Sequence, residues 1–273
     1  MILLVLVSDF FASKLPGLYG YEIVFICDDS SSMNTELSDV SGPYTKPPTR
    51  WDELKQTVSV VITLANIFDQ NGVDIYFLNR KPIFNVRSSK ELISIFARPP
   101  EEYHPTLIAR TLRTVFQDKK KEIEEGTLLI LLATDGEPTD DYGNVKIDEL
   151  RRILEEERKP PKRVPVSIIA CTDDKASMVY LNNWDKEIPN LDVVDDYKSE
   201  KKEIRERKGQ TYAFSFGDYI VKILMGAIDR SIDLLDEDED EYEQYDPAIT
   251  TINNAPKNKH QSSCLYYFYT DSN

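Results

Sequence analysis

Three oxygen-bearing side chains alternate directly after a short apolar run near the N-terminus. The run is Tyr21–Cys27, and Asp28, Ser30 and Ser32 follow it. In an extended turn these three side chains point to one side of the chain, whereas the two residues between them point to the other. Because carboxylate and hydroxyl oxygens are the ligands that Mg²⁺ prefers, the spacing predicts a hard-cation site. Asp and Ser also cap backbone amides in ordinary turns, so the pentad alone leaves both interpretations open.

The elements around this pentad alternate between strands and helices. Continuous apolar runs predict strands buried on both faces, and apolar residues at helical spacing predict amphipathic helices. The predicted strands are 21–27, 127–133 and 164–171, with an edge strand at 191–194. The predicted helices are 49–67, 88–96, 106–124, 147–158 and 216–235.

Two further strand-like runs, Val73–Leu78 and Pro82–Val86, are separated by only three residues. This connection is too short for a crossover, so the two runs must pair antiparallel as a hairpin. Together with the alternation, the hairpin predicts an α/β fold with an open, mostly parallel, doubly wound (Rossmann-like) sheet. We expect one antiparallel edge strand and helices on both faces.

In open sheets of this kind, ligands bind beyond the carboxyl ends of the strands. The site is therefore expected in the loops after Cys27, before Thr106 and after Ala133. Thr106 precedes a predicted helix, and Asp135 follows the most hydrophobic strand within Thr-Asp-Gly. The sequence thus predicts that the loops that carry the pentad, Thr106 and Asp135 meet at one edge of the sheet.

This three-part constellation resembles the metal-ion-dependent adhesion site (MIDAS) of the von Willebrand factor A (vWA) domain. That site is built from Asp-x-Ser-x-Ser, a distant Thr and a distant Asp, which correspond here to residues 28–32, Thr106 and Asp135. The resemblance covers about 20–235, and the predicted hairpin is similar to the edge strand of the family. This leaves an N-terminal extension (1–20) before a vWA-like domain (21–235). Six consecutive acidic residues at 236–241 cannot pack, and no periodicity follows them, so we expect an acidic, disordered C-terminal tail (236–273).

The resemblance implies a role for each of the five residues. Ser30, Ser32 and, when ligand is bound, Thr106 would touch Mg²⁺ or Mn²⁺ directly, while Asp28 and Asp135 would hold the ion through waters. Neutral hydroxyl ligands leave much of the charge of the cation uncompensated, so it seeks a carboxylate from a partner. The implied function is a protein-binding (adhesion or scaffold) module without catalysis, whose partner offers an Asp or Glu side chain.

Two departures from the family pattern bear on the loops rather than on the ligands. Family members commonly have Gly at one or both spacers of the pentad, where this chain has Asp29 and Ser31. They also commonly have Gly before the Thr, where this chain has 103–105, Tyr-His-Pro. We therefore expect stiffer loops and an altered metal affinity, with every liganding side chain retained.

Two alternatives stay open. One is a Mg²⁺-dependent phosphoryl-transfer or receiver-like domain, in which Asp28 and Asp29 hold the metal and Asp135 accepts the phosphoryl group. Such chemistry needs a fixed cation, and Lys175 is the one basic residue that the sequence offers near these strand ends. The other alternative is a vWA scaffold that binds no metal.

Composition excludes several other classes. The chain has 273 residues, with 33 Lys and Arg against 48 Asp and Glu, a net charge of −15 that disfavours nucleic acid as a partner. The apolar start, Met1–Val7, is too short for a membrane span or a signal peptide, so no membrane insertion is expected. Three cysteines without framework spacing argue against a disulfide scaffold, and no Asn-x-Ser/Thr acceptor occurs. We expect a cytoplasmic protein.

Overall fold

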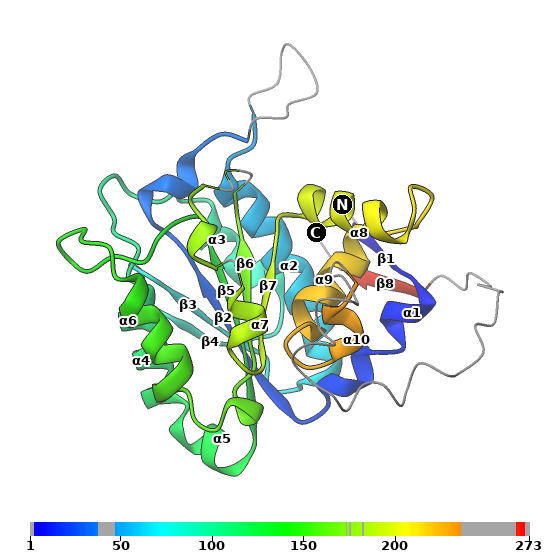
Figure 1. The fold of residues 1–273 in the computed structure, drawn as a ribbon, viewed down its shortest axis with the longest axis horizontal. Helices are drawn as coiled ribbons and strands as arrows, with labels where there is room; N and C mark the ends of the chain where they lie inside the picture. The colour runs from blue at the N-terminus through cyan, green and yellow to red at the C-terminus, as the bar shows by residue number, and fades with distance from the viewer. Residues whose placement is uncertain are drawn as a thin grey trace.

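A six-stranded sheet lies at the centre of the computed structural model (Figure 1). The model describes residues 3–37, 47–172, 174, 176–181, 183–235 and 266–270. The strands of the sheet are β2 (Tyr21–Cys27), β3 (Val73–Phe77), β4 (Ile83–Val86), β5 (Thr127–Thr134), β6 (Val166–Ala170) and β7 (Leu191–Val194). Their order is β4-β3-β2-β5-β6-β7, and every neighbouring pair is parallel except β3 and β4. The predicted open α/β sheet with one antiparallel edge strand is confirmed.

Helices cover both faces of this sheet, as Figure 1 shows. One face carries α2 (Arg50–Phe68), α3 (Ile93–Phe96) and α9 (Phe216–Met225), and the other carries α4 (Ile108–Asp118), α6 (Ile147–Arg152) and α7 (Trp184–Glu187). Side chains of β2 alternate between the two layers: Phe25 is buried in the first and Ile26 in the second. A central strand with apolar residues on both faces must be covered on both sides, which explains the doubly wound arrangement.

Helix α2 begins where the sequence places it. Thr49 is the N-cap residue: its Oγ1 accepts a hydrogen bond from the backbone N–H of Asp52 at 3.2 Å. In return, the Asp52 carboxylate accepts one from the Thr49 N–H at 3.0 Å. This capping box satisfies two amides that the first turn of a helix leaves without partners, so the start of α2 is well defined.

Other helix predictions need correction. The segment 106–124 forms two helices, α4 and α5 (Lys120–Glu125), which are separated at Lys119, and the Lys119 ammonium pairs with Asp74 of β3 at 2.6 Å. The segment 216–235 also divides, because Asp229 caps a separate helix α10 (Arg230–Asp233). Helix α8 (Tyr197–Lys208) was not expected. Only Glu200 and Ile204 are buried in it, so it has no apolar stripe.

The N-terminal residues pack on the domain. Strand β1 (Leu3–Val7), helix α1 (Asp9–Ala12) and a 3₁₀ turn at Leu15–Leu18 precede the sheet. Phe11 is buried in the α2–α9 layer, and the Ser8 N–H donates to the Asp218 carboxylate of α9 at 2.7 Å. The predicted extension 1–20 is therefore continuous with the hydrophobic core of the domain.

Strand β1 pairs with a segment from the other end of the chain. Tyr266–Thr270 form β8, which lies antiparallel to β1 in a separate two-stranded sheet. These five residues fall within 236–273, the segment for which the sequence predicts a disordered tail. The remainder of that segment, including the acidic run 236–241, lies outside the described residues.

A buried arginine ties the ends of three elements together. Arg158, which follows α6 and its π-helical last turn Ile153–Glu157, is 1% exposed. Its Nε donates to the Leu154 carbonyl at 3.0 Å, and its Nη1 donates to the Val164 carbonyl at 2.8 Å. It also donates to the carbonyls of Pro189 and Asn190 at 2.6 and 2.9 Å. Burial lowers the pKa of the guanidinium to about 10, and these carbonyls offset part of the desolvation cost.

We expect Arg158→Leu to lower the free energy of unfolding by about 3 kcal/mol or more, because several buried carbonyls would lose their donor at once. Urea denaturation measures this change. Arg163→Leu is the matched control, since exposed Arg163 donates to a single carbonyl, that of Glu124, at 2.7 Å. An equal effect of both substitutions would contradict the structural role assigned to Arg158.

Candidate functional site

The predicted site residues lie at the carboxyl ends of two neighbouring strands. β2 and β5 pair in parallel, with Cys27 opposite Ala133, so both strands end at the same edge of the sheet (Figure 1). The Asp28 N–H continues the ladder by donating to the Ala133 carbonyl at 3.0 Å. Asp28 and Asp135 therefore emerge side by side. Both residues are buried at this edge of the sheet.

Asp28 is fully buried, and both of its carboxylate oxygens accept hydrogen bonds. Oδ1 accepts from the Ser30 N–H at 2.8 Å, and Oδ2 accepts from the Thr134 hydroxyl at 2.6 Å. Burial, together with the nearby charge of Asp135, nevertheless raises the pKa of Asp28 to about 7. The ionised form of this carboxyl group is thus costly, and a cation at this place would stabilise it.

The two serines of the pentad link Asp28 to Asp135. The hydroxyl oxygens of Ser30 and Ser32 lie 3.0 Å apart, and the Ser32 hydroxyl donates to Asp135 Oδ1 at 2.7 Å. Ser30 is buried, whereas Ser32 is exposed. Hydrogen bonds thus connect four of the five predicted residues, which are Asp28, Ser30, Ser32 and Asp135.

Thr106 reaches the same edge on a different loop. The His104 carbonyl accepts from the Ser31 N–H at 3.3 Å, and the Pro105 carbonyl accepts from Asn79 Nδ2 at 3.0 Å. These contacts hold the residues before Thr106 against the pentad. Thr106 is 8% exposed, and within the described part of the chain its hydroxyl makes no hydrogen bond. That oxygen is available as a ligand.

Asp29 points away from the other carboxylates. Its Oδ1 accepts from the backbone and side-chain N–H groups of Asn79 at 2.8 and 3.2 Å, and its Oδ2 pairs with Arg80 Nε at 3.3 Å. The Arg80 guanidinium stacks on Trp51, 5.0 Å from the ring centroid. A side chain at this spacer therefore fastens the pentad loop to the β3–β4 connection, which a glycine there could not do.

Arg50 is a site residue that no sequence pattern indicates. It is the first residue of α2, and its Nη1 lies 2.8 Å from Asp135 Oδ2. The sequence offered Lys175 as the basic candidate, and Lys175 lies outside the described residues. Thr134 directly precedes Asp135 and has no predicted role, yet its hydroxyl donates a hydrogen bond to Asp28. Both contacts depend on long-range folding, so local spacing could not have identified them.

The donor set fits a hard cation. Two serine hydroxyls 3.0 Å apart, an unbonded threonine hydroxyl and two carboxylates supply the neutral and anionic oxygens that Mg²⁺ and Mn²⁺ take. No group of three or more His, Cys, Asp or Glu side chains suited to a metal occurs among the described residues. The candidate site does not count as such a group, because it has only two carboxylates and its other three ligands would be hydroxyls.

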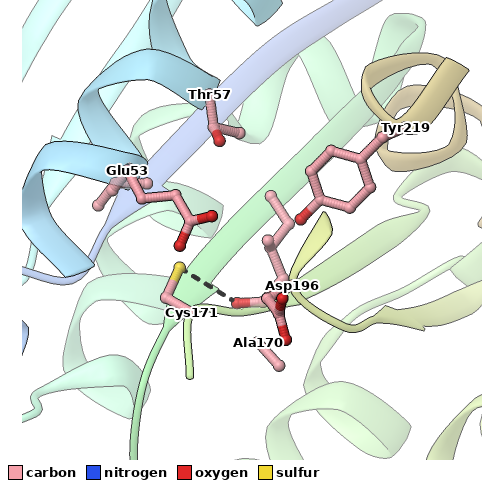
Figure 2. A pocket seen from close by; sticks show the side chains of 8 residues that line it. Glu53, Thr57, Ala170, Cys171, Asp196 and Tyr219 are labelled. Atoms are coloured by element: carbon pink, nitrogen blue, oxygen red, sulfur yellow. Dashed lines mark hydrogen bonds between the residues drawn. The ribbon is translucent and has the colours of Figure 1, made fainter. Parts of the chain in front are cut away.

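Two of the cavities that are lined by described residues lie outside this cluster. The smaller, about 10 Å³, has room for one water molecule and is lined by Glu53, Thr57, Cys171 and Tyr219, among others (Figure 2). Burial raises the pKa of the Cys171 thiol well above its usual range, which makes it unreactive. The larger, about 350 Å³, lies at the amino end of β7 and contains none of the predicted ligands.

Comparison with known proteins shows the fold alone. No family model matches the chain, and no curated protein matches it. Among solved structures it is similar to a mutant of the PilB minor pilin from Streptococcus sanguinis, with a TM-score of 0.50 and 12% sequence identity. The match covers 80% of this chain and 62% of that chain. In the described residues, no helix combines the length and apolar character needed to cross a membrane.

Proposed function

We propose that this chain is a vWA-like, divalent-cation-dependent protein-binding module that docks a partner carboxylate at the MIDAS-like site. The observation that carries the proposal is the meeting of Asp28, Ser30, Ser32 and Asp135 in one hydrogen-bonded cluster, with the loop of Thr106 held against it. Three hydroxyls and two carboxylates at the ligand-binding edge of an open α/β sheet suit Mg²⁺.

Each residue has a distinct part in this proposal. The ion, when bound, would supply a positive charge that attracts a partner carboxylate as its remaining ligand. Ser30 and Ser32 offer hydroxyl oxygens, while Asp28 and Asp135 are held by the ends of β2 and β5. Thr106 offers its unbonded hydroxyl once a ligand is present. The net charge of −15 favours a protein partner over nucleic acid.

One observation favours the phosphoryl-transfer alternative: Arg50 places a fixed cation beside Asp135. Burial argues against it, because the side chains of Asp29 and Asp135 are 0% exposed and Asp28 is also fully buried. A carboxylate that must attack a phosphoryl donor has to be reachable by that donor.

Incubation with acetyl phosphate and Mg²⁺, followed by intact-mass measurement, separates the two functions. We expect no phosphoryl adduct, because the buried carboxylates cannot reach the donor. An adduct that disappears in Asp135→Asn would establish the alternative in place of the docking module.

We expect the protein to bind Mg²⁺ or Mn²⁺ at one site, and Asp28→Asn to weaken this binding by about a hundredfold, on the order of 2.7 kcal/mol. The substitution keeps the shape of the side chain but removes its charge. Titration calorimetry measures the affinity, and thermal melting verifies that the variant is folded.

Asp29→Asn provides the matched control, because the neighbouring carboxylate faces Asn79 and Arg80 instead of the site. It should change Mg²⁺ affinity by less than about threefold, about 0.65 kcal/mol. Equal Mg²⁺ affinity in wild type and Asp28→Asn would refute the proposed ligand set.

We expect Thr106→Val to weaken partner binding by about tenfold, on the order of 1.4 kcal/mol, while Mg²⁺ affinity without partner changes much less. The substitution keeps the shape and deletes one oxygen. A pull-down in Mg²⁺, eluted with chelator, supplies the partner, and Thr114→Val on the exposed face of α4 is the control. Partner binding that survives both Thr106→Val and chelation would place the docking surface elsewhere.

A further inference from the structure

The candidate site already contains a cation that belongs to the chain. Arg50 Nη1 donates to Asp135 Oδ2 at 2.8 Å, and the two side chains are 12% and 0% exposed. The other oxygen of the same carboxylate accepts from Ser32 at 2.7 Å. Both oxygens of Asp135 are therefore engaged by groups of the protein itself.

Arg50 differs from the other arginines that are well covered by the fold. Arg80 pairs with Asp29 and also donates to the carbonyls of Ile95, Arg98 and Pro99, and Arg158 is bound by carbonyls on several elements. In the described residues, the guanidinium of Arg50 has one hydrogen-bond partner, Asp135, and its buried Nε has none. This guanidinium therefore joins the start of α2 to one group only, the Asp135 carboxylate of the site. Its position is set by the carboxylate of the site.

We propose that Arg50 is an internal cation that competes with the divalent metal for Asp135, so that the guanidinium keeps the site closed until a metal ion displaces it. The inference rests on the proposed function, because it assigns a regulator to the same site. It goes further because it describes the metal-free protein, in which the guanidinium of Arg50 neutralises the Asp135 carboxylate.

Electrostatics fixes the sign of the effect. The negative charge of the site comes from Asp135 and from Asp28 when it is ionised, and Arg50 offsets one unit of it. A divalent ion entering beside the guanidinium is repelled by it at short range, in surroundings where screening by water is weak. The ion also has to break a charge-assisted hydrogen bond before Asp135 can act through a metal-bound water. Both effects lower metal affinity, so removing the charge of Arg50 should raise it.

The test is Mg²⁺ titration calorimetry on the full chain in its wild-type, Arg50→Gln and Arg50→Lys forms. We expect Arg50→Gln to bind Mg²⁺ about tenfold more tightly than wild type, and Arg50→Lys, which keeps the charge, to stay within about threefold of it. The metal-free thermal midpoint of Arg50→Gln should fall, because Asp135 loses its counter-ion, and saturating Mg²⁺ should restore it.

The matched control is Arg110→Gln, which removes the same charge from an exposed arginine. Arg110 pairs with Asp141 at 2.7 Å and does not contact Asp135. This variant should change Mg²⁺ affinity by less than about twofold. A gain of similar size in Arg110→Gln would show a general effect of net charge and overturn the specific role of Arg50.

The remaining outcomes separate this inference from the proposed function. If wild type binds Mg²⁺ and Arg50→Gln binds it equally or more weakly, Arg50 is not a competitor, and the docking site stands without it. Binding by Arg50→Gln alone would support the inference in its strongest form. Absence of binding in both proteins would overturn the inference together with the metal site on which it rests.

Discussion

The burial of two carboxylates at the ends of adjacent parallel strands is the constraint on which the candidate site depends. Asp28 and Asp135 leave β2 and β5 at the same edge, so the parallel pairing that buries the apolar strands also brings two like charges together. Such a pair is stable only when hydrogen bonds and positive charge surround it. Ser30, Thr134 and Arg50 supply these contacts, and the architecture of the loops follows from that need.

Much of the fold could be predicted because the central elements are strongly patterned. β2 and β5 are continuous apolar runs, and the hairpin of β3 and β4 follows from a connection too short to cross the sheet. Helices without an apolar stripe could not be found in this way, as α8 shows. The pairing of β1 with β8 joins the two ends of the chain, and no local pattern reports it.

In the candidate site, too, some residues could be predicted from the sequence and others could not. The loops that carry residues 28–32, Thr106 and Asp135 could be predicted because strand ends in a parallel sheet share an edge. The choice of these residues within the loops came from their resemblance to the vWA motif. The orientation of Asp29 could not, since it depends on Asn79 and Arg80 in the next loop. Nor could Arg50, whose partner lies 85 residues away in the sequence. Contacts of this kind are fixed by tertiary packing.

The most direct test of the account is a crystal structure of the chain soaked in Mn²⁺, with anomalous scattering used to locate the ion. We predict one anomalous peak within bonding distance of the hydroxyl oxygens of Ser30 and Ser32, with the Arg50 guanidinium displaced from Asp135. An empty site at saturating Mn²⁺, with Arg50 still bound to Asp135, would contradict it.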